Sequence, residues 1–213
     1  MEKLFNNEVE KQLKEVLSHM IKPITIIMFS NEDCLTCKET KQLLNEVVSL
    51  NNKISLEIKE IKNSKNEVEK YNIKLVPSFV LLDENKQYKG VKFNGIPAGH
   101  EINSFISAVL EMSGIQAGFN EDLITRIKKI SKPVNIKVFI TLACPHCPGA
   151  VQTAHRLAML NKNITAEMIE AQTFSDESVK YNVSGVPKII INENKELVGN
   201  HPIENFLEQI ESI

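Results

Sequence analysis

Two cysteines separated by two residues stand in the segment Thr141-Leu142-Ala143-Cys144-Pro145-His146-Cys147-Pro148. The run before it, residues 134–140, is mostly apolar and rich in β-branched side chains, as expected of a buried strand. After it, apolar residues from Val151 to Leu160 recur at helical spacing. The pattern predicts that both cysteines lie where a strand passes into a helix.

The start of a helix favours a reactive thiol. Its first amides lack partners within the helix and its dipole is positive there, so a thiolate is stabilised relative to a thiol. We expect Cys144, at the N-cap, to be the nucleophile and Cys147, one turn inward, to be the resolving thiol. Pro145 suits the first helical position, and a protonated His146 would lower the pKa of the Cys144 thiol further. Because this stabilises the reduced form, the disulfide is expected to be oxidising.

The same arrangement occurs earlier in the chain. Cys34-Leu35-Thr36-Cys37 follows a short apolar run and precedes apolar residues at helical spacing. Positions 34 and 144 differ by 110, and the same offset relates Pro23 to Pro133, Tyr71 to Tyr181, Val76 to Val186 and Pro77 to Pro187. An internal duplication explains this register. The first pair has neither proline nor histidine between its cysteines, so we expect it to be the more reducing and weaker site.

Each half of the chain shows the same order of patterns: helix, strand, CxxC helix, strand, short helix, strand, strand, helix. A βαβ crossover followed by a hairpin gives a mixed sheet with helices on both faces. We therefore predict an α/β chain of two units, residues 1–115 and 116–213, with a boundary near the glycines of segment 112–118.

Composition narrows the class of protein. The 213 residues have a formal net charge of -2 with both signs interspersed, so no nucleic-acid surface is expected. Residues 1–14 lack the apolar core of a signal peptide, and no later run reaches membrane-spanning length. We therefore expect a cytoplasmic protein, in which cysteines are more often catalytic or metal-binding than structural.

Taken together, these motifs resemble the two-unit protein disulfide oxidoreductases, also called glutaredoxin-like proteins, of the thioredoxin superfamily. Besides the two CxxC pairs, the resemblance rests on residues 93–101, residues 144–148, and Tyr181-Asn182-Val183 with Val186-Pro187-Lys188-Ile189. It implies two tandem thioredoxin-like folds packed side by side that exchange disulfides with protein substrates. It also implies that a thioredoxin-reductase-like flavoenzyme supplies the electrons. The redox-active groups would be the disulfides themselves, with no bound cofactor or metal.

The resemblance also equates Pro77 and Pro187 with the cis proline that faces the CxxC pair in this fold. Sequence leaves the isomer open, because a cis bond is the minority form before proline. If the bonds are cis, the backbone of Val76 and Val186 offers a short edge on which an extended substrate can pair. These four residues are therefore the candidate substrate-binding positions.

Two features of related proteins are missing. Met28 and Val138 stand six residues before the first cysteines, where thioredoxins carry a buried aspartate. The Gly-Gly of glutathione-binding glutaredoxins appears only as Gly199-Asn200. The resemblance therefore does not extend to a thioredoxin-type proton shuttle or to glutathione use.

The main hypothesis is a thiol-disulfide oxidoreductase acting on proteins, with the second pair as principal site. An alternative is an electron donor to a peroxidase, similar to the N-terminal region of alkyl hydroperoxide reductase flavoproteins, although that region usually keeps one CxxC pair. Two non-enzymatic alternatives are a zinc site made of all four cysteines and a binding scaffold with inert pairs. Zinc sites usually have much shorter spacings between their ligand pairs, which counts against the former.

Overall fold

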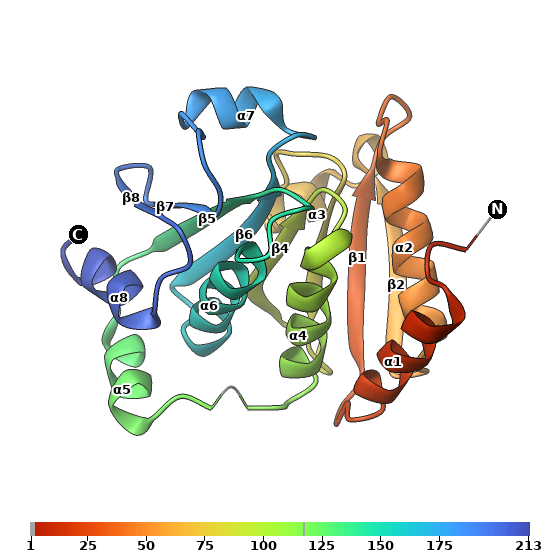
Figure 1. The fold of residues 1–213 in the computed structure, drawn as a ribbon, viewed down its shortest axis with the longest axis horizontal. Helices are drawn as coiled ribbons and strands as arrows, with labels where there is room; N and C mark the ends of the chain where they lie inside the picture. Colours follow the sequence, from red (N-terminus) through yellow and green to blue (C-terminus); the bar gives the residue numbers. More distant parts are fainter. Residues whose placement is uncertain (1–2, 117) are drawn as a thin grey trace.

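The order of elements predicted for each half is the order observed (Figure 1). The computed structural model describes residues 3–116 and 118–213, so residues 1–2 of the first predicted unit and residue 117 of the predicted boundary segment lie outside it. Unit one contains α1 (Asn7–Leu17), β1 (Ile24–Ser30), α2 (Cys37–Ser49), β2 (Ile54–Glu60), η1 (Ile61–Asn63), α3 (Lys65–Lys70), β3 (Ser78–Leu82), β4 (Tyr88–Asn94), η2 (Gly99–Glu101) and α4 (Ile102–Met112). Unit two contains α5 (Glu121–Lys129), β5 (Val134–Ile140), α6 (Cys147–Leu160), β6 (Ile164–Glu170), α7 (Ser175–Lys180), β7 (Lys188–Ile191), β8 (Lys195–Val198) and α8 (Ile203–Glu211). None of these helices is long and apolar enough to cross a bilayer.

The strands of both units join one continuous sheet. Its order across the described residues is β2-β1-β3-β4-β6-β5-β7-β8, so unit two repeats the strand order of unit one. Within each unit the first two strands are parallel and the closing hairpin is antiparallel, which gives the predicted mixed sheet. The units meet where β4 pairs in parallel with β6, in a register from Val91 opposite Ala166 to Asn94 opposite Ile169.

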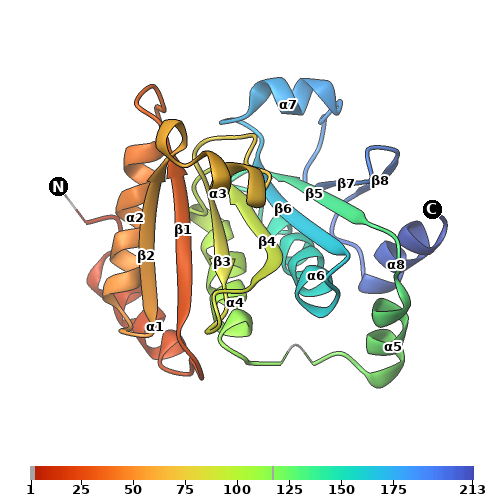
Figure 2. The same ribbon diagram turned by 180° about the vertical axis from the view of Figure 1, so that it is seen from behind.

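Alternating side chains divide the core into layers on the two faces of the sheet. In β1, Ile26 and Met28 join the large core under α1, α2, α4, α5, α6 and α8, while Ile27 and Phe29 face the other way. On that second face Val68 of α3 packs on the small cluster of unit one, whereas the cluster of unit two is covered by Phe174 and Tyr181, the residues on either side of α7. In Figure 2, α7 itself lies beyond the upper ends of the strands. Helices therefore lie on both faces, as predicted.

Buried polar groups accompany the seam between the units. Glu167 on β6 accepts a hydrogen bond from Asn94 at 3.0 Å, and its carboxylate lies 3.7 Å from Nζ of the buried Lys92 on β4. His155 on α6 lies with its Nε2 3.2 Å from the carbonyl oxygen of Lys92 and meets the ring of Phe93 edge-on, with centroids 4.6 Å apart. Burial lowers the pKa of His155 to about 4, so this ring is neutral near pH 7.

Gly90 provides a test of the seam. It has a φ of +79°, and a Cβ there would lie 2.5 Å from the carbonyl oxygen of Ile164. We expect Gly90→Ala to lower the free energy of unfolding by about 3 kcal/mol, because it combines left-handed strain with a backbone clash. Urea unfolding followed by circular dichroism measures this. Gly118→Ala is the matched control, because a Cβ at Gly118 meets nothing within 4 Å; equal losses in both variants would contradict the packing argument.

Candidate active site

Both CxxC pairs are disulfides at the turns that follow β1 and β5. The Cα atoms are 5.4 Å apart in Cys34–Cys37 and 5.5 Å apart in Cys144–Cys147. The helices begin at the second cysteine of each pair, with Thr36 and His146 as their N-caps. The prediction that Cys144 is the N-cap and Pro145 the first helical residue was therefore wrong by two residues, because His146 is the N-cap and Cys147 the first helical residue.

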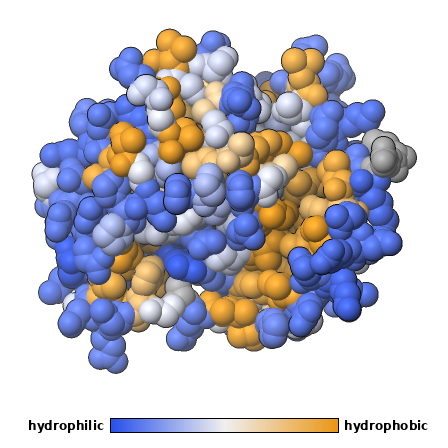
Figure 3. Space-filling model, viewed as in Figure 1, coloured by the Kyte–Doolittle hydropathy of each residue, from blue (hydrophilic) through white to orange (hydrophobic). Residues whose placement is uncertain are grey.

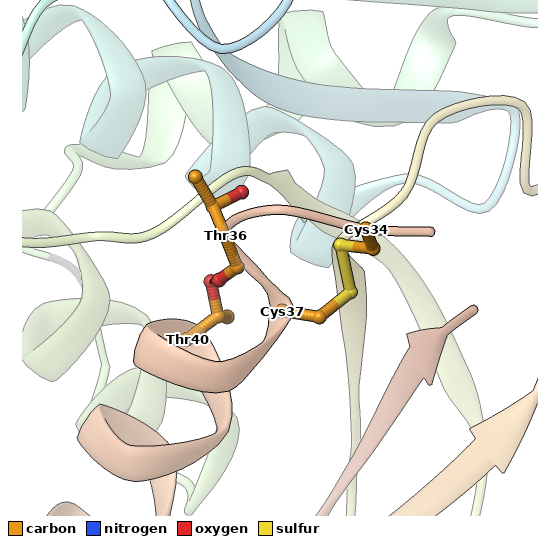
Figure 4. Close-up of a disulfide and its surroundings, with 4 residues drawn as sticks. All are labelled: Cys34, Thr36, Cys37 and Thr40. Atoms are coloured by element: carbon orange, nitrogen blue, oxygen red, sulfur yellow. Dashed lines mark hydrogen bonds between the residues drawn. A yellow bond between two sulfur atoms is a disulfide. The ribbon is translucent and has the colours of Figure 1, made fainter. Parts of the chain in front are cut away.

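The physical reason for the later start lies in the backbone. Pro148 has no N–H, so it cannot donate to the carbonyl of Cys144, and the proline is accommodated in the first turn of α6. In unit one, the N–H and Oγ1 of Thr40 both donate to the carbonyl of Thr36, at 3.0 and 2.8 Å, and this opens α2 (Figure 4). Each first cysteine thus sits in a turn just ahead of the helix, still on the side of its free amides.

Exposure separates the two cysteines of each pair. Cys147 is fully buried and Cys37 is 9% exposed, as suits resolving thiols that only their partner needs to reach. Cys34 is half-buried, whereas Cys144 is only 9% exposed. The first cysteine of unit one is therefore the more open of the two candidate nucleophiles in the oxidised protein.

The residues between the cysteines lie at the surface. Pro145 and His146 are exposed, and Leu35 at the position of Pro145 is 92% exposed. The chemical difference between the two sites is thus presented to solvent and to any partner. Their roles in setting the thiol pKa stay predictions.

The two prolines lie at the starts of β3 and β7. The peptide bonds Val76-Pro77 and Val186-Pro187 are both cis, and both prolines are buried. The carbonyl of Pro77 accepts a hydrogen bond from Gly95 at 2.9 Å, and the carbonyl of Pro187 accepts one from Gly199 at 2.8 Å. Val76 lines a cavity together with Cys34, and its role in substrate binding stays a prediction.

Sequence reasoning missed one buried carboxyl. Glu101 on η2 is fully buried; Ser104 Oγ donates to its Oε2, and its Oε1 has no hydrogen-bond partner among the described residues. Burial raises the pKa of Glu101 to about 7. Although η2 belongs to unit one, it packs against α6, and the backbone N–H of His100 donates to the carbonyl of Leu142 at 3.0 Å. Unit one thus places a titratable carboxyl at the active-site helix of unit two, where no sequence motif predicted it.

No group of three or more His, Cys, Asp or Glu side chains within the described residues could hold a metal ion. The two cysteine pairs are instead separate disulfides. The four-cysteine zinc site considered from the sequence therefore finds no support.

Known proteins share this geometry. The thioredoxin-domain family matches residues 22–107 and 134–212, which include both CxxC pairs and most of the chain. The chain belongs to the thioredoxin-domain family. The alkyl hydroperoxide reductase AhpF of Staphylococcus aureus (strain NCTC 8325 / PS 47) is 31% identical over 209 residues, which are 98% of this thioredoxin-domain protein. The chain spans 38% of the length of that relative.

Two solved structures share the whole architecture. The NTD_N/C domain of alkylhydroperoxide reductase AhpF from Enterococcus faecalis (V583) superposes with a TM-score of 0.92 at 29% identity, covering 97% of this chain and 99% of that one. A protein disulfide oxidoreductase from Aeropyrum pernix K1 gives a TM-score of 0.90 at 26% identity, covering 97% and 92%. The predicted tandem thioredoxin-like fold is confirmed, and this thioredoxin-domain protein is a thiol-disulfide oxidoreductase in the general sense.

The residues between the cysteines can be exchanged between the sites. The double variant Pro145→Leu and His146→Thr gives site two the motif of site one. We expect the Cys144 thiol pKa to rise by about one unit, because the imidazole between the cysteines and the turn preorganised by proline are lost, and the reduction potential to fall by about 30 mV. Thiolate absorbance against pH and glutathione redox titration measure these values. The reciprocal variant Leu35→Pro and Thr36→His should shift site one in the opposite sense; unchanged values in both variants would contradict the assigned tuning.

Glu101→Gln tests the buried carboxyl. Its folded-state pKa, about 7, lies above the ordinary value of 4.5, so its stabilising contribution is complete below pH 4.5 and is lost as the pH rises through 7. The glutamine variant should therefore gain stability relative to the parent between pH 5 and pH 8, by at most about 3 kcal/mol. Urea unfolding at both pH values measures this gain. Glu69→Gln, at an exposed position of α3, is the control; equal pH dependence in both variants would rule out the assigned titration.

Proposed function

We propose that this chain carries electrons from a thioredoxin-reductase-like flavoenzyme to the disulfide of a thiol peroxidase. The observation that carries the proposal is the 31% identity to the alkyl hydroperoxide reductase AhpF along 98% of the chain. The match to a solved N-terminal domain of such a protein over 99% of that domain supports the same role. The electron-donor alternative raised from the sequence thus becomes the leading one.

Site two is the proposed donor. In its reduced form the Cys144 thiolate attacks the partner's disulfide, one partner sulfur leaves as a thiolate, and a mixed disulfide remains. Cys147 then attacks Cys144, which restores the Cys144–Cys147 disulfide and releases the second partner thiol. Two electrons pass to the partner in each cycle. The flavoenzyme returns them by reducing the disulfide, and the reaction fits a cytoplasmic role in redox homeostasis.

Proton movement accompanies each exchange, because thiols must ionise to attack and leaving thiolates must be protonated. Glu101 has a pKa near 7 and lies on an element packed against α6. Such a group can accept or return a proton near neutral pH. We propose that it takes the place of the buried aspartate that Met28 and Val138 lack.

A second candidate function is general disulfide exchange with many proteins. The presence of a second CxxC pair favours it, as does the similarity to the Aeropyrum pernix protein disulfide oxidoreductase. The two functions use the same residues and differ in the partner that reacts fastest. Val186 and Pro187, which correspond to Val76 and Pro77 of unit one, are the proposed contacts for either partner.

A coupled assay separates the two functions. It contains a nicotinamide cofactor, a thioredoxin-reductase-type flavoenzyme, this chain, and either a two-cysteine peroxidase with an alkyl hydroperoxide or insulin. If the chain is a peroxidase donor, kcat/KM for the peroxidase should exceed that for insulin by at least about 100-fold, because specificity is set by differential transition-state binding.

Matched variants assign the sites within that assay. Cys144→Ser should reduce peroxidase turnover at least about 1000-fold, because it removes the attacking sulfur, whereas Cys34→Ser should retain most of it. A higher kcat/KM for insulin would favour general disulfide exchange. Equal losses in the two serine variants would overturn the assignment of site two as the donor.

A further inference from the structure

A cavity of about 580 Å³ adjoins Cys34 and draws its walls from both units. From unit one come the turn around Leu35, Val76 beside the cis proline, and Ile96. From unit two come Leu142 and the segment 170–173 that leads from β6 towards α7. In the view of Figures 1 and 3 it lies near the top of the molecule, where the outline dips between α7 and the loop that follows β1.

The unit-two wall is held rigidly. The carboxylate of Glu170 is buried and accepts hydrogen bonds from the N–H of Gln172 at 3.2 Å and from the N–H and Oγ1 of Thr173 at 2.7 and 2.6 Å. Gly95, at the end of β4, lies so close that a Cβ there would be 2.7 Å from Glu170 Cβ. This wall is therefore positioned by the seam between the units, and the cavity exists only in the assembled pair.

Site two has no counterpart of this wall. The strand order repeats along the sheet, so unit two flanks the β4 side of unit one, and β8, which corresponds to β4, is an edge strand of the described sheet. Within the described residues no further unit stands beside Cys144. Two similar motifs thus have different surroundings.

The lining of the cavity indicates what fits it. Four of the lining side chains are aliphatic, namely Leu35, Val76, Ile96 and Leu142. Among the other lining residues are Asp33 and Glu170, and no lysine or arginine. An apolar side chain is therefore accommodated, whereas a segment rich in carboxylates is repelled.

We propose that this inter-unit cavity is a selective docking site for an extended, non-acidic segment of a partner protein that carries a disulfide next to a bulky apolar residue. The inference rests on the proposed dithiol chemistry and extends it to site one. Reduced Cys34 attacks the partner disulfide and expels one partner thiolate. Cys37 then attacks Cys34, so the Cys34–Cys37 disulfide forms, the second partner thiolate leaves, and two electrons have passed to the partner. Unit two acts here as the specificity element of unit one.

The test isolates site one in the double variant Cys144→Ser and Cys147→Ser, with dithiothreitol as reductant. Three probes are compared: a disulfide-linked peptide dimer with leucine and lysine beside the cysteine, the same peptide with two aspartates there, and bis(2-hydroxyethyl) disulfide. We expect kcat/KM for the leucine-lysine peptide to exceed that for the aspartate peptide about tenfold.

Gln172→Trp places an indole in the unit-two wall without changing the backbone N–H that Glu170 accepts. It should lower kcat/KM for the leucine-lysine peptide about tenfold and lower that for the small disulfide by a smaller factor, because the small disulfide fills less of the cavity. The control, Gln87→Trp, adds the same indole at the exposed end of the β3–β4 hairpin, away from Pro77, and should change neither rate. Circular dichroism melts confirm that both variants fold.

Three results would overturn the docking site: no preference between the two peptides, a peptide rate unaffected by Gln172→Trp, or the same loss in Gln87→Trp. If the double variant Cys144→Ser and Cys147→Ser reduces none of the three probes, site one does not exchange disulfides, and the proposed docking site is overturned. Failure of the proposed peroxidase role is seen separately, because these peptide rates do not depend on the peroxidase or the flavoenzyme.

Discussion

The parallel pairing of β4 with β6 is the contact on which the arrangement depends. It joins two repeated units into one sheet in which the second follows the first in the same strand order. The close approach of Gly90 to Ile164, the buried Lys92 and His155, and the half-buried Glu167 all belong to this junction. A slip of one residue would turn the buried Val91 and Phe93 of β4 to the other face, so the register of the seam is fixed and sets where the loops of one unit lie relative to the other.

A duplicated motif thereby becomes two different sites. Site one faces a wall supplied by unit two, including Leu142 and Gln172. Site two instead rests against η2 of unit one, which brings Glu101 with a pKa near 7 to the active-site helix. Two repeated units placed side by side in one sheet have different neighbours. Packing alone can therefore make the two sites different, whatever residues lie between the cysteines.

Particular residues show how much of the fold and of the candidate site could be predicted from the sequence. The 110-residue offset located both cysteine pairs, both prolines and the strands on either side, and the observed order of elements agrees. The helix start was misplaced at Cys144, because the apolar pattern does not report where the first regular hydrogen bond forms. Glu101 was not predicted, because an isolated glutamate has no periodic or spacing signal. Its raised pKa depends on burial by elements that the sequence does not place together.

The sequence by itself determined the candidate chemistry: two dithiols at strand-to-helix turns, with a Val-Pro pair downstream of each and with proline and histidine between the cysteines of the second. Those features are local, because spacing along a strand and a helix sets which residues meet within one unit. Only the tertiary structure decided that the two sheets merge, that Cys34 opens into a cavity shared by both units, and that η2, the element of unit one that carries Glu101, packs against α6 of unit two. These depend on contacts between distant strand edges, and an edge pairing leaves no pattern in either strand that identifies its partner.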